Sequence, residues 1–212
     1  MDAAATATLV RGLERLELPA SLAAPLAAYA DLLLQWNRRF NLTGARDAAD
    51  LVSRHLLDCL AIAPFVDADP ILDIGSGAGL PGLLLAMALP HRHFTLADAN
   101  RKRTTFLEQA RLTLGLANVA VTQADVARLA PDPRFAVATA RAVATLPDLW
   151  ALAAAALAPG GRLLAMKGRV PAAEVGILRG RGLCVQVTRL VVPGLDEERH
   201  LVTIGAPAGT VQ

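Results

Sequence analysis

The segment around residue 77 limits the fold more than any other part of the chain. Between an apolar run at 71–74 and an apolar stretch of helix length at 81–89, residues 73–82 read Asp-Ile-Gly-Ser-Gly-Ala-Gly-Leu-Pro-Gly. Alternate glycines let the backbone turn sharply and let a ligand approach the main chain where a Cβ would collide. A strand, a glycine turn and a helix in this order indicate an open α/β sheet. Its ligand lies beyond the carboxyl ends of the strands.

The rest of the chain continues the alternation of strands and helices, which predicts βαβ units and a parallel sheet. Further strands are expected at 93–97, 119–122, 135–139 and 162–166, and further helices at 102–114 and 147–157. The last two apolar runs, 183–190 and 200–204, are joined by a short turn-rich segment, so they should pair antiparallel. Apolar positions three and four apart predict helices over 4–64. We expect an N-terminal helical extension at 1–66 and a sheet domain at 67–206, packed as one unit.

Composition and charge exclude several classes of protein. The chain has 212 residues, 54% hydrophobic and 4% aromatic, which suits helices on one buried sheet. No apolar run reaches the roughly 18–20 residues that cross a bilayer. Residues 1–10 lack a basic start followed by an apolar core, so we expect a cytoplasmic protein without membrane contact. Cys59 and Cys184 have apolar neighbours and no metal-ligand spacing, which predicts buried, reduced thiols and no metal site. A net charge of +2 does not by itself indicate a nucleic-acid binder.

Two ligand classes fit the glycine loop. Residues 77–82 also satisfy GxGxxG, so an NAD-binding oxidoreductase is one alternative. Three features favour a methyl donor: Asp73 precedes the glycines, as in the DxGxGxG loop of methyltransferases; Pro81 is tolerated early in the next helix; and residues 157–163 resemble the turn before the fifth strand of class I methyltransferases. The resemblance implies a Rossmann-like α/β sheet, mostly parallel with a C-terminal antiparallel hairpin. It also implies S-adenosylmethionine as cofactor and S-adenosylhomocysteine as product.

Residues after the second and third strands complete the expected nucleoside site. Asp98 ends the second strand about 20 residues beyond the glycines, where its carboxylate can accept hydrogen bonds from both ribose hydroxyls. Capping of the helix that starts near Arg101 is its alternative role. Asp125, Val126 and Ala127 follow the third strand, where this fold contacts the adenine.

Segments along nearly the whole chain resemble a single family. They are Trp36-Asn37, Asn41-Leu42-Thr43, Arg54-His55-Leu-Leu-Asp58, Leu80-Pro81-Gly82, Lys102-Arg103 with Phe106-Leu107, Ala140-Arg141-Ala142, Lys167-Gly168 and Glu198-Arg199-His200-Leu201. In this order they resemble the glucose-inhibited division protein B family, bacterial guanine-N7 methyltransferases of 16S ribosomal RNA. The resemblance implies methylation of N7 in guanine 527 of 16S rRNA, which is either free or within the small ribosomal subunit. Many relatives have an acidic residue where Ala127 stands, so only a main-chain donor contact would survive there.

The chemistry of guanine N7 asks for few catalytic side chains. Its lone pair can attack a sulfonium methyl without a general base, so the enzyme mainly positions the reactants. Arg141 ends the fourth strand and is expected beside the methyl group, facing the guanine edge, a phosphate or the donor carboxylate. A structural ion pair is its alternative role. His55 and Asp58 share one helix face and could pair with each other.

The predicted site has a cofactor part and an RNA part. The cofactor contacts are Asp73, Gly75, Gly77, Gly79, Leu80, Asp98, Asp125, Val126, Ala127 and Arg141, of which Arg141 is also the catalytic, positioning residue. The RNA contacts are Arg38, Arg39, Arg54, His55, Lys102, Arg103 and Lys167, with Arg46 in the same basic clusters. We expect a monomer. A class I methyltransferase acting on a small molecule or a protein is the other alternative, because the same loop would serve it.

Overall fold

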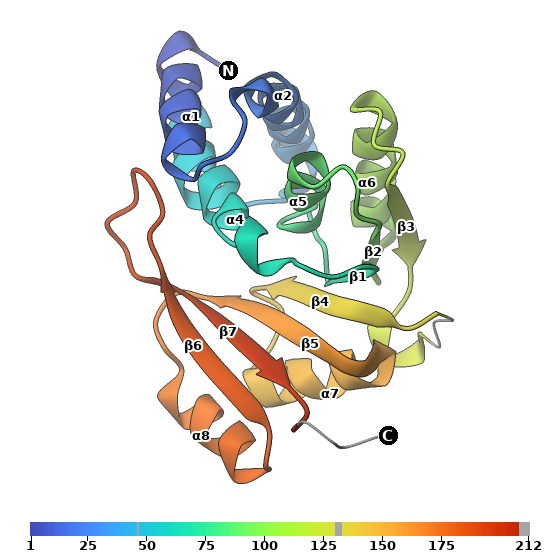
Figure 1. Cartoon of the computed structure of the whole chain (residues 1–212). Helices are drawn as coiled ribbons and strands as arrows, with labels where there is room; N and C mark the ends of the chain where they lie inside the picture. Colours follow the sequence, from blue (N-terminus) through green and yellow to red (C-terminus); the bar gives the residue numbers. More distant parts are fainter. Residues whose placement is uncertain (46, 130–132, 208–212) are drawn as a thin grey trace.

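The computed structural model describes residues 1–45, 47–129 and 133–207, which form a seven-stranded sheet in the order β3-β2-β1-β4-β5-β7-β6 (Figure 1). The strands are β1 Ile71–Ile74, β2 Phe94–Asp98, β3 Val119–Gln123, β4 Phe135–Arg141, β5 Leu157–Lys167, β6 Cys184–Leu190 and β7 Arg199–Gly205. Strands β1 to β5 are parallel, and β7 runs antiparallel to both β5 and β6. The predicted parallel sheet with a closing antiparallel hairpin is therefore confirmed.

Helices cover both faces of the sheet. Figure 1 shows α1, α2, α4, α5 and α6 on one side and α7 and α8 on the other. Their bounds are α1 Ala3–Arg15, α2 Ala23–Phe40, α3 Ala48–Leu51, α4 Asp58–Leu60, α5 Gly82–Ala88, α6 Arg101–Thr113, α7 Leu146–Ala156 and α8 Ala172–Gly180. A π-helical segment, η2 Val52–Leu57, joins α3 to α4, and short 3-10 turns lie at η1 Ala20–Leu22, η3 Ala63–Phe65 and η4 Val126–Arg128. The predicted helical extension is confirmed.

Strand β1 shows how the sequence builds a core on each face. All four of its residues are buried. Ile71 belongs to the core cluster under the N-terminal helices, whereas Leu72 and Ile74 belong to the cluster under α7 and α8. The first cluster extends from Ala5 in α1 to Leu201 in β7, so the extension and the sheet share one core. The exact boundary after residue 66 stays a prediction.

The two cysteines have different surroundings. Cys59 in α4 is buried, but Cys184 is exposed, and both thiols are free. The expectation of two buried thiols is therefore wrong for Cys184, because it begins β6, the edge strand of the sheet, which pairs with β7 alone among the described strands. No helix in the described ranges combines the length and the apolar character needed to cross a membrane.

A buried hydrogen bond joins the helical extension to the glycine loop. Tyr29 of α2 is completely buried, and its hydroxyl donates to the carbonyl oxygen of Ala78 at 2.6 Å. The Tyr29 ring also packs against Phe106 of α6, with 6.4 Å between ring centroids. One side chain of the extension therefore holds a backbone carbonyl of the loop in place.

Tyr29→Phe should lower the free energy of unfolding by about 1–3 kcal/mol, because it removes the hydrogen bond to the buried Ala78 carbonyl without changing the ring. Urea unfolding measures the loss, and calorimetric titration should show weaker S-adenosylmethionine binding as the loop loosens. Thr8→Val is the control, because the Thr8 hydroxyl bonds the Ala4 carbonyl on an exposed helix face. Equal stability of the two variants would contradict the role of Tyr29.

Candidate functional site

The glycine loop follows β1 with the geometry that its sequence predicts. Gly75, Gly77 and Gly79 have φ values of 63°, 57° and 85°, which L side chains rarely adopt. A Cβ on Gly79 would lie 2.3 Å from Leu83, so this glycine allows the helix to approach. A Cβ on Gly77 would meet only the Gly75 oxygen, at 3.8 Å, within a 4 Å radius. Gly77 therefore leaves free space beside the loop.

Asp73 supports the loop from beneath. Its carboxylate is fully buried and accepts hydrogen bonds from the Thr139 hydroxyl at 2.8 Å and from the Gly82 amide at 3.2 Å. Burial raises the pKa of Asp73 to about 6, opposed by its hydrogen bonds from Thr139 and Ser76. Asp73 therefore fixes the loop backbone, and its predicted contact with the cofactor stays a prediction.

Asp98 connects the loop to the second strand. Its Oδ2 accepts from the Gly77 amide at 2.9 Å, and its Oδ1 accepts from the Asn100 amide at 2.8 Å. The cap of α6 is Asn100, whose side chain accepts from Lys102 and Arg103, so the alternative of Asp98 as the helix cap is wrong. Asp98 ends β2 beside the loop, as predicted.

Residues 125–127, in the turn after β3, are not among those that line the cavity beside the glycine loop. Asp125 caps η4 by accepting from the Ala127 amide at 3.1 Å, so that amide already has a partner within its own turn. Val126 is buried in the core cluster under α7 and α8. None of the three predicted adenine contacts lines a described cavity with the loop, and their role stays a prediction.

Two cavities meet at the carboxyl ends of the strands. The loop cavity, of about 470 Å³, is lined by Leu42, Thr43, Gly44, His55, Gly75, Ser76, Gly77, Ala78, Leu80, Arg103, Arg141, Ala142 and Val143. The strand-end cavity, of about 620 Å³, is lined by Gly44, Asp50, Arg54, His55, Asp58, Arg141, Ala142, Met166, Lys167, Gly168, Leu190, Arg199 and His200. They share Gly44, His55, Arg141 and Ala142. A ligand in one cavity can therefore lie next to a ligand in the other.

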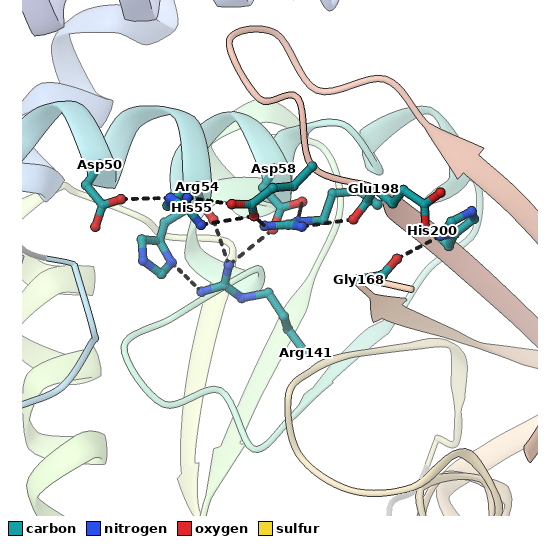
Figure 2. Close-up of polar contacts among 10 residues, drawn as sticks. Asp50, Arg54, His55, Asp58, Arg141, Gly168, Glu198 and His200 are labelled. Carbon is teal, nitrogen blue, oxygen red and sulfur yellow. Dashed lines mark hydrogen bonds and ion pairs between the residues drawn. The ribbon is translucent and has the colours of Figure 1, made fainter. Parts of the chain in front are cut away.

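Arg141 lies where the two cavities meet, and its guanidinium group contacts three residues of the helical extension (Figure 2). Its Nη2 donates to His55 Nδ1 at 2.7 Å, and its Nη1 donates to Asp58 Oδ2 and to the Arg54 carbonyl oxygen, both at 3.3 Å. The next residue, Ala142, has a φ of 56°, a strained value that clusters at functional sites. The suggested pairing of His55 with Asp58 is not found: both side chains contact Arg141 at the end of β4 instead.

The ion pairs continue along the wall of the strand-end cavity. Asp58 Oδ1 lies 3.4 Å from Arg199 Nε. Glu197 pairs with Arg199 at 3.1 Å and with Arg54 at 2.5 Å, so it connects the two guanidinium groups. Arg54 also pairs with Asp50 at 2.9 Å. Burial raises the pKa of Asp58, and the neighbouring Arg141 and Arg199 guanidinium groups oppose this. The cations of this wall are therefore largely neutralised within the protein.

His55 is fixed in one neutral form. A guanidinium can only donate, so Nδ1 of His55 accepts from Arg141 and the ring proton is on Nε2, 3.5 Å from the Thr43 hydroxyl. Burial, followed by the charge of Arg141, lowers the pKa of His55 to about 4. Neither ring nitrogen is then free to take a proton from a substrate at neutral pH.

The other predicted cations are divided among three places. Arg54 and Lys167 line the strand-end cavity, and Arg103 lines the loop cavity. Arg38 and Arg39 line a separate cavity between α2 and α6, near Lys102. Arg46 lies outside the described residues. Sequence reasoning did not place Arg199, His200 or Tyr29 in the site; the Glu198-Arg199-His200-Leu201 segment was the available signal for the first two.

Similarity to known proteins extends over almost the entire chain. The GidB family model, described as rRNA small subunit methyltransferase G, matches residues 23–202. A ribosomal RNA small subunit methyltransferase G of Stenotrophomonas maltophilia is 44% identical over 207 residues, covering 98% of both chains. A protein of the same name from Aromatoleum aromaticum is 45% identical over 205 residues, covering 93% of this chain and 97% of its own.

Solved structures resemble the fold at low sequence identity. A glycopeptide N-methyltransferase, MtfA, complexed with S-adenosyl-L-methionine, superposes with a TM-score of 0.61 at 14% identity, covering 73% of this chain and 88% of its own. A precorrin-6y C5,15-methyltransferase from Geobacter metallireducens gives a TM-score of 0.54 at 12% identity, covering 70% and 87%. The predicted class I methyltransferase fold is confirmed.

Gly77→Ala should weaken S-adenosylmethionine binding by about 10- to 100-fold, because the new methyl group would stand in the loop cavity. Gly115→Ala is a matched control: its φ of 64° is similar to the 57° of Gly77, and a Cβ there meets nothing within 4 Å. Both alanines strain the backbone by about 1–2 kcal/mol. Calorimetric titration should separate them, and equal affinities would overturn the assignment of the loop cavity.

Stability should depend on pH through His55. Its pKa in the folded chain, about 4, lies below the ordinary 6.5, so the unfolded chain binds more protons between these values. The stabilisation is complete above pH 6.5 and is lost as the pH falls towards 4. Urea unfolding at pH 7 and pH 5 should show a larger loss for the natural chain than for His55→Gln, which keeps an acceptor for Arg141. An imidazole that titrates near 6.5 by NMR would refute this.

Proposed function

The chain belongs to the family of rRNA small subunit methyltransferase G, and from this we propose that it methylates N7 of a guanine in 16S ribosomal RNA, guanine 527, with S-adenosylmethionine as the methyl donor. One observation carries the proposal: the loop cavity and the strand-end cavity share His55 and Arg141. A methyl transferase needs two adjoining sites, one for the donor and one for the acceptor.

The residues of the loop cavity fit the donor. The cavity is lined by the backbone of Gly75 and Gly77 and by the apolar side chain of Leu80. A ligand can approach the backbone closely at Gly77, where no side chain intervenes. The Asp98 carboxylate ends β2 beside them; Gly77 and Asn100 donate to it and Arg103 lies 3.4 Å from its Oδ2, which leaves lone-pair capacity for ribose hydroxyls. When bound there, S-adenosylmethionine supplies an electrophilic methyl group on a sulfonium.

The junction suits an acceptor that needs no base. His55 holds its ring proton on Nε2 and accepts from Arg141 at Nδ1, and Asp58 is buried between two guanidinium groups. Neither Arg141 nor these two neighbours is free to remove a proton. Guanine N7 attacks through a lone pair and needs no such group, whereas an exocyclic amine must lose a proton. This supports N7 over the amino group.

Arg141 acts in this proposal as a positioning residue. One guanidinium contacts Arg54 and His55 of η2 and Asp58 of α4, which holds both helical segments against the end of β4 and sets the shape of the junction. Effective molarity of well-placed reactants can supply most of the rate enhancement for such a transfer. We further propose that the protein works in the cytoplasm, as a monomer, on 16S rRNA that is free or within the small subunit.

The direct test is to incubate the purified protein with labelled S-adenosylmethionine and either deproteinised 16S rRNA or small ribosomal subunits from an unmethylated source. Mass spectrometry of nuclease fragments should locate one 7-methylguanosine, at guanine 527. Label at an amino group would refute the N7 assignment. Absence of label in both RNA substrates, with intact donor binding, would favour a small-molecule or protein substrate.

Arg141→Lys should lower kcat by about 100-fold, because lysine keeps the charge but cannot make all three contacts, and misplacement of about 1 Å costs about that factor. Arg179→Lys is the control, since Arg179 bonds the Val185 carbonyl at an exposed position on α8. Single-turnover methylation measures the difference. Full activity of Arg141→Lys would show that the three contacts of the guanidinium group are not needed for methyl transfer.

A further inference from the structure

The cations near the two cavities fall into paired and unpaired groups. Those already engaged within the protein are Arg54, Arg103, Arg141, Lys167 and Arg199, each with a carboxylate within 4 Å. Among the described residues, Arg38, Arg39 and Lys102 have no ion pair or hydrogen bond to a carboxylate, and all three are exposed. Their charge is therefore available to an anion from outside.

These unpaired cations surround an aromatic pair at the end of α2. A cavity of about 440 Å³ is lined by Gln35, Trp36, Arg38, Arg39, Phe40 and Gln109, and with Lys102 we call these residues the α2–α6 patch. Lys102 Nζ lies 6.0 Å from the centre of the Phe40 ring. No carboxylate of the described residues lines this cavity. The patch thus combines a partly exposed aromatic ring with positive charge.

The aromatic pair is rigid but exposed. Trp36 contacts Phe40 with 5.1 Å between centroids and Phe106 with 5.5 Å, and its indole donates to Gln109 Oε1 at 3.1 Å. Phe40 is nevertheless 42% exposed, and it is the one aromatic among the large exposed hydrophobic side chains of the described chain. A ring that is held by Trp36 and partly exposed can stack with a base once the flexible Lys102 side chain turns from the ring to a phosphate.

The patch adjoins the donor side of the site. Leu42 and Arg103, which line the loop cavity, lie two residues after Phe40 and one after Lys102. Figure 1 shows α2 and α6 side by side, and their contact through Trp36 and Phe106 places both sides of the patch on one surface. A strand entering the two cavities can therefore also reach the patch.

We propose that the α2–α6 patch is a second nucleotide subsite, in which an unpaired base of the RNA substrate stacks on Phe40 while its phosphates contact Arg38, Arg39 and Lys102. Aromatic rings recognise unpaired bases by stacking, and cations that track the backbone add a salt-dependent attraction. The subsite rests on the proposed function and supplies binding, away from the transferred methyl group. It selects RNA in which a nucleotide near the target is unpaired.

The test measures fluorescence anisotropy of a short labelled single-stranded oligoribonucleotide, and of the same strand in a duplex, with the full chain. Phe40→Ala should weaken single-strand binding by roughly 5- to 150-fold, as expected for loss of one stacked base. Phe40→Tyr should retain it. Ile177→Ala, which removes another exposed apolar side chain, on α8, is the control. Lys102→Gln should lower the slope of log affinity against log salt by about one.

Methylation assays separate this inference from the proposed function. With rRNA or subunits as substrate, Phe40→Ala should raise KM while kcat and S-adenosylmethionine affinity stay unchanged. If the natural protein is active and the KM of Phe40→Ala is unchanged, the proposed subsite is wrong, but the proposed function is not affected. A raised KM for subunits with unchanged oligonucleotide binding would assign the patch to a ribosomal protein, and also overturn it. Failure of the natural protein to methylate RNA at all would instead remove the proposed function.

Discussion

The candidate site depends on the backbone conformation of the glycine loop after β1, which needs support from the rest of the chain. Three glycines with positive φ turn the chain after β1, and three buried or nearly buried side chains hold that turn: Asp73 bonds the Gly82 amide, Asp98 the Gly77 amide, and Tyr29 the Ala78 carbonyl. They come from β1, β2 and α2, so the loop is fixed from three directions. Desolvation opposes the charge of Asp73, whose pKa rises to about 6. This desolvation of the Asp73 carboxylate is unfavourable, but it fixes the loop backbone, which can approach a ligand more closely than side chains can.

The N-terminal helices are consequently part of the site. Tyr29 reaches the loop, the segment from Leu42 to Gly44 lines the loop cavity, and the π-helical turn presents His55 and the Arg54 carbonyl to Arg141. A π turn widens the helix and is often found where function needs an unusual direction of side chain or carbonyl. The sheet domain alone would lack one wall of each cavity. Residues before position 60 therefore belong to both cavities, together with the ends of the strands.

Local patterns predicted the strands, the helical extension and the glycine loop because each depends on short-range chemistry: apolar period, glycine freedom and turn residues. They could not predict pairings between distant residues. The position of Asp73 before the glycines does not reveal its bonds to Thr139 and Gly82. His55 and Asp58 looked like partners but meet Arg141 from β4. Arg199 joins the same network from β7. The spacing of residues along the chain does not predict these contacts. The position of Cys184 on the edge strand β6 could not be predicted either, because it depends on the strand order of the sheet.

The division of cations clarifies how a chain with a net charge of only +2 can meet RNA. At the junction, positive groups face carboxylates at close range, so they shape the cavity and present little field to the outside. Within each close ion pair the two charges offset each other, so these pairs add little to long-range attraction. The proposed patch differs, because Arg38, Arg39 and Lys102 have no ion pair among the described residues. In this proposal, one set of cations shapes the site and another attracts the RNA, and the small net charge does not show that division.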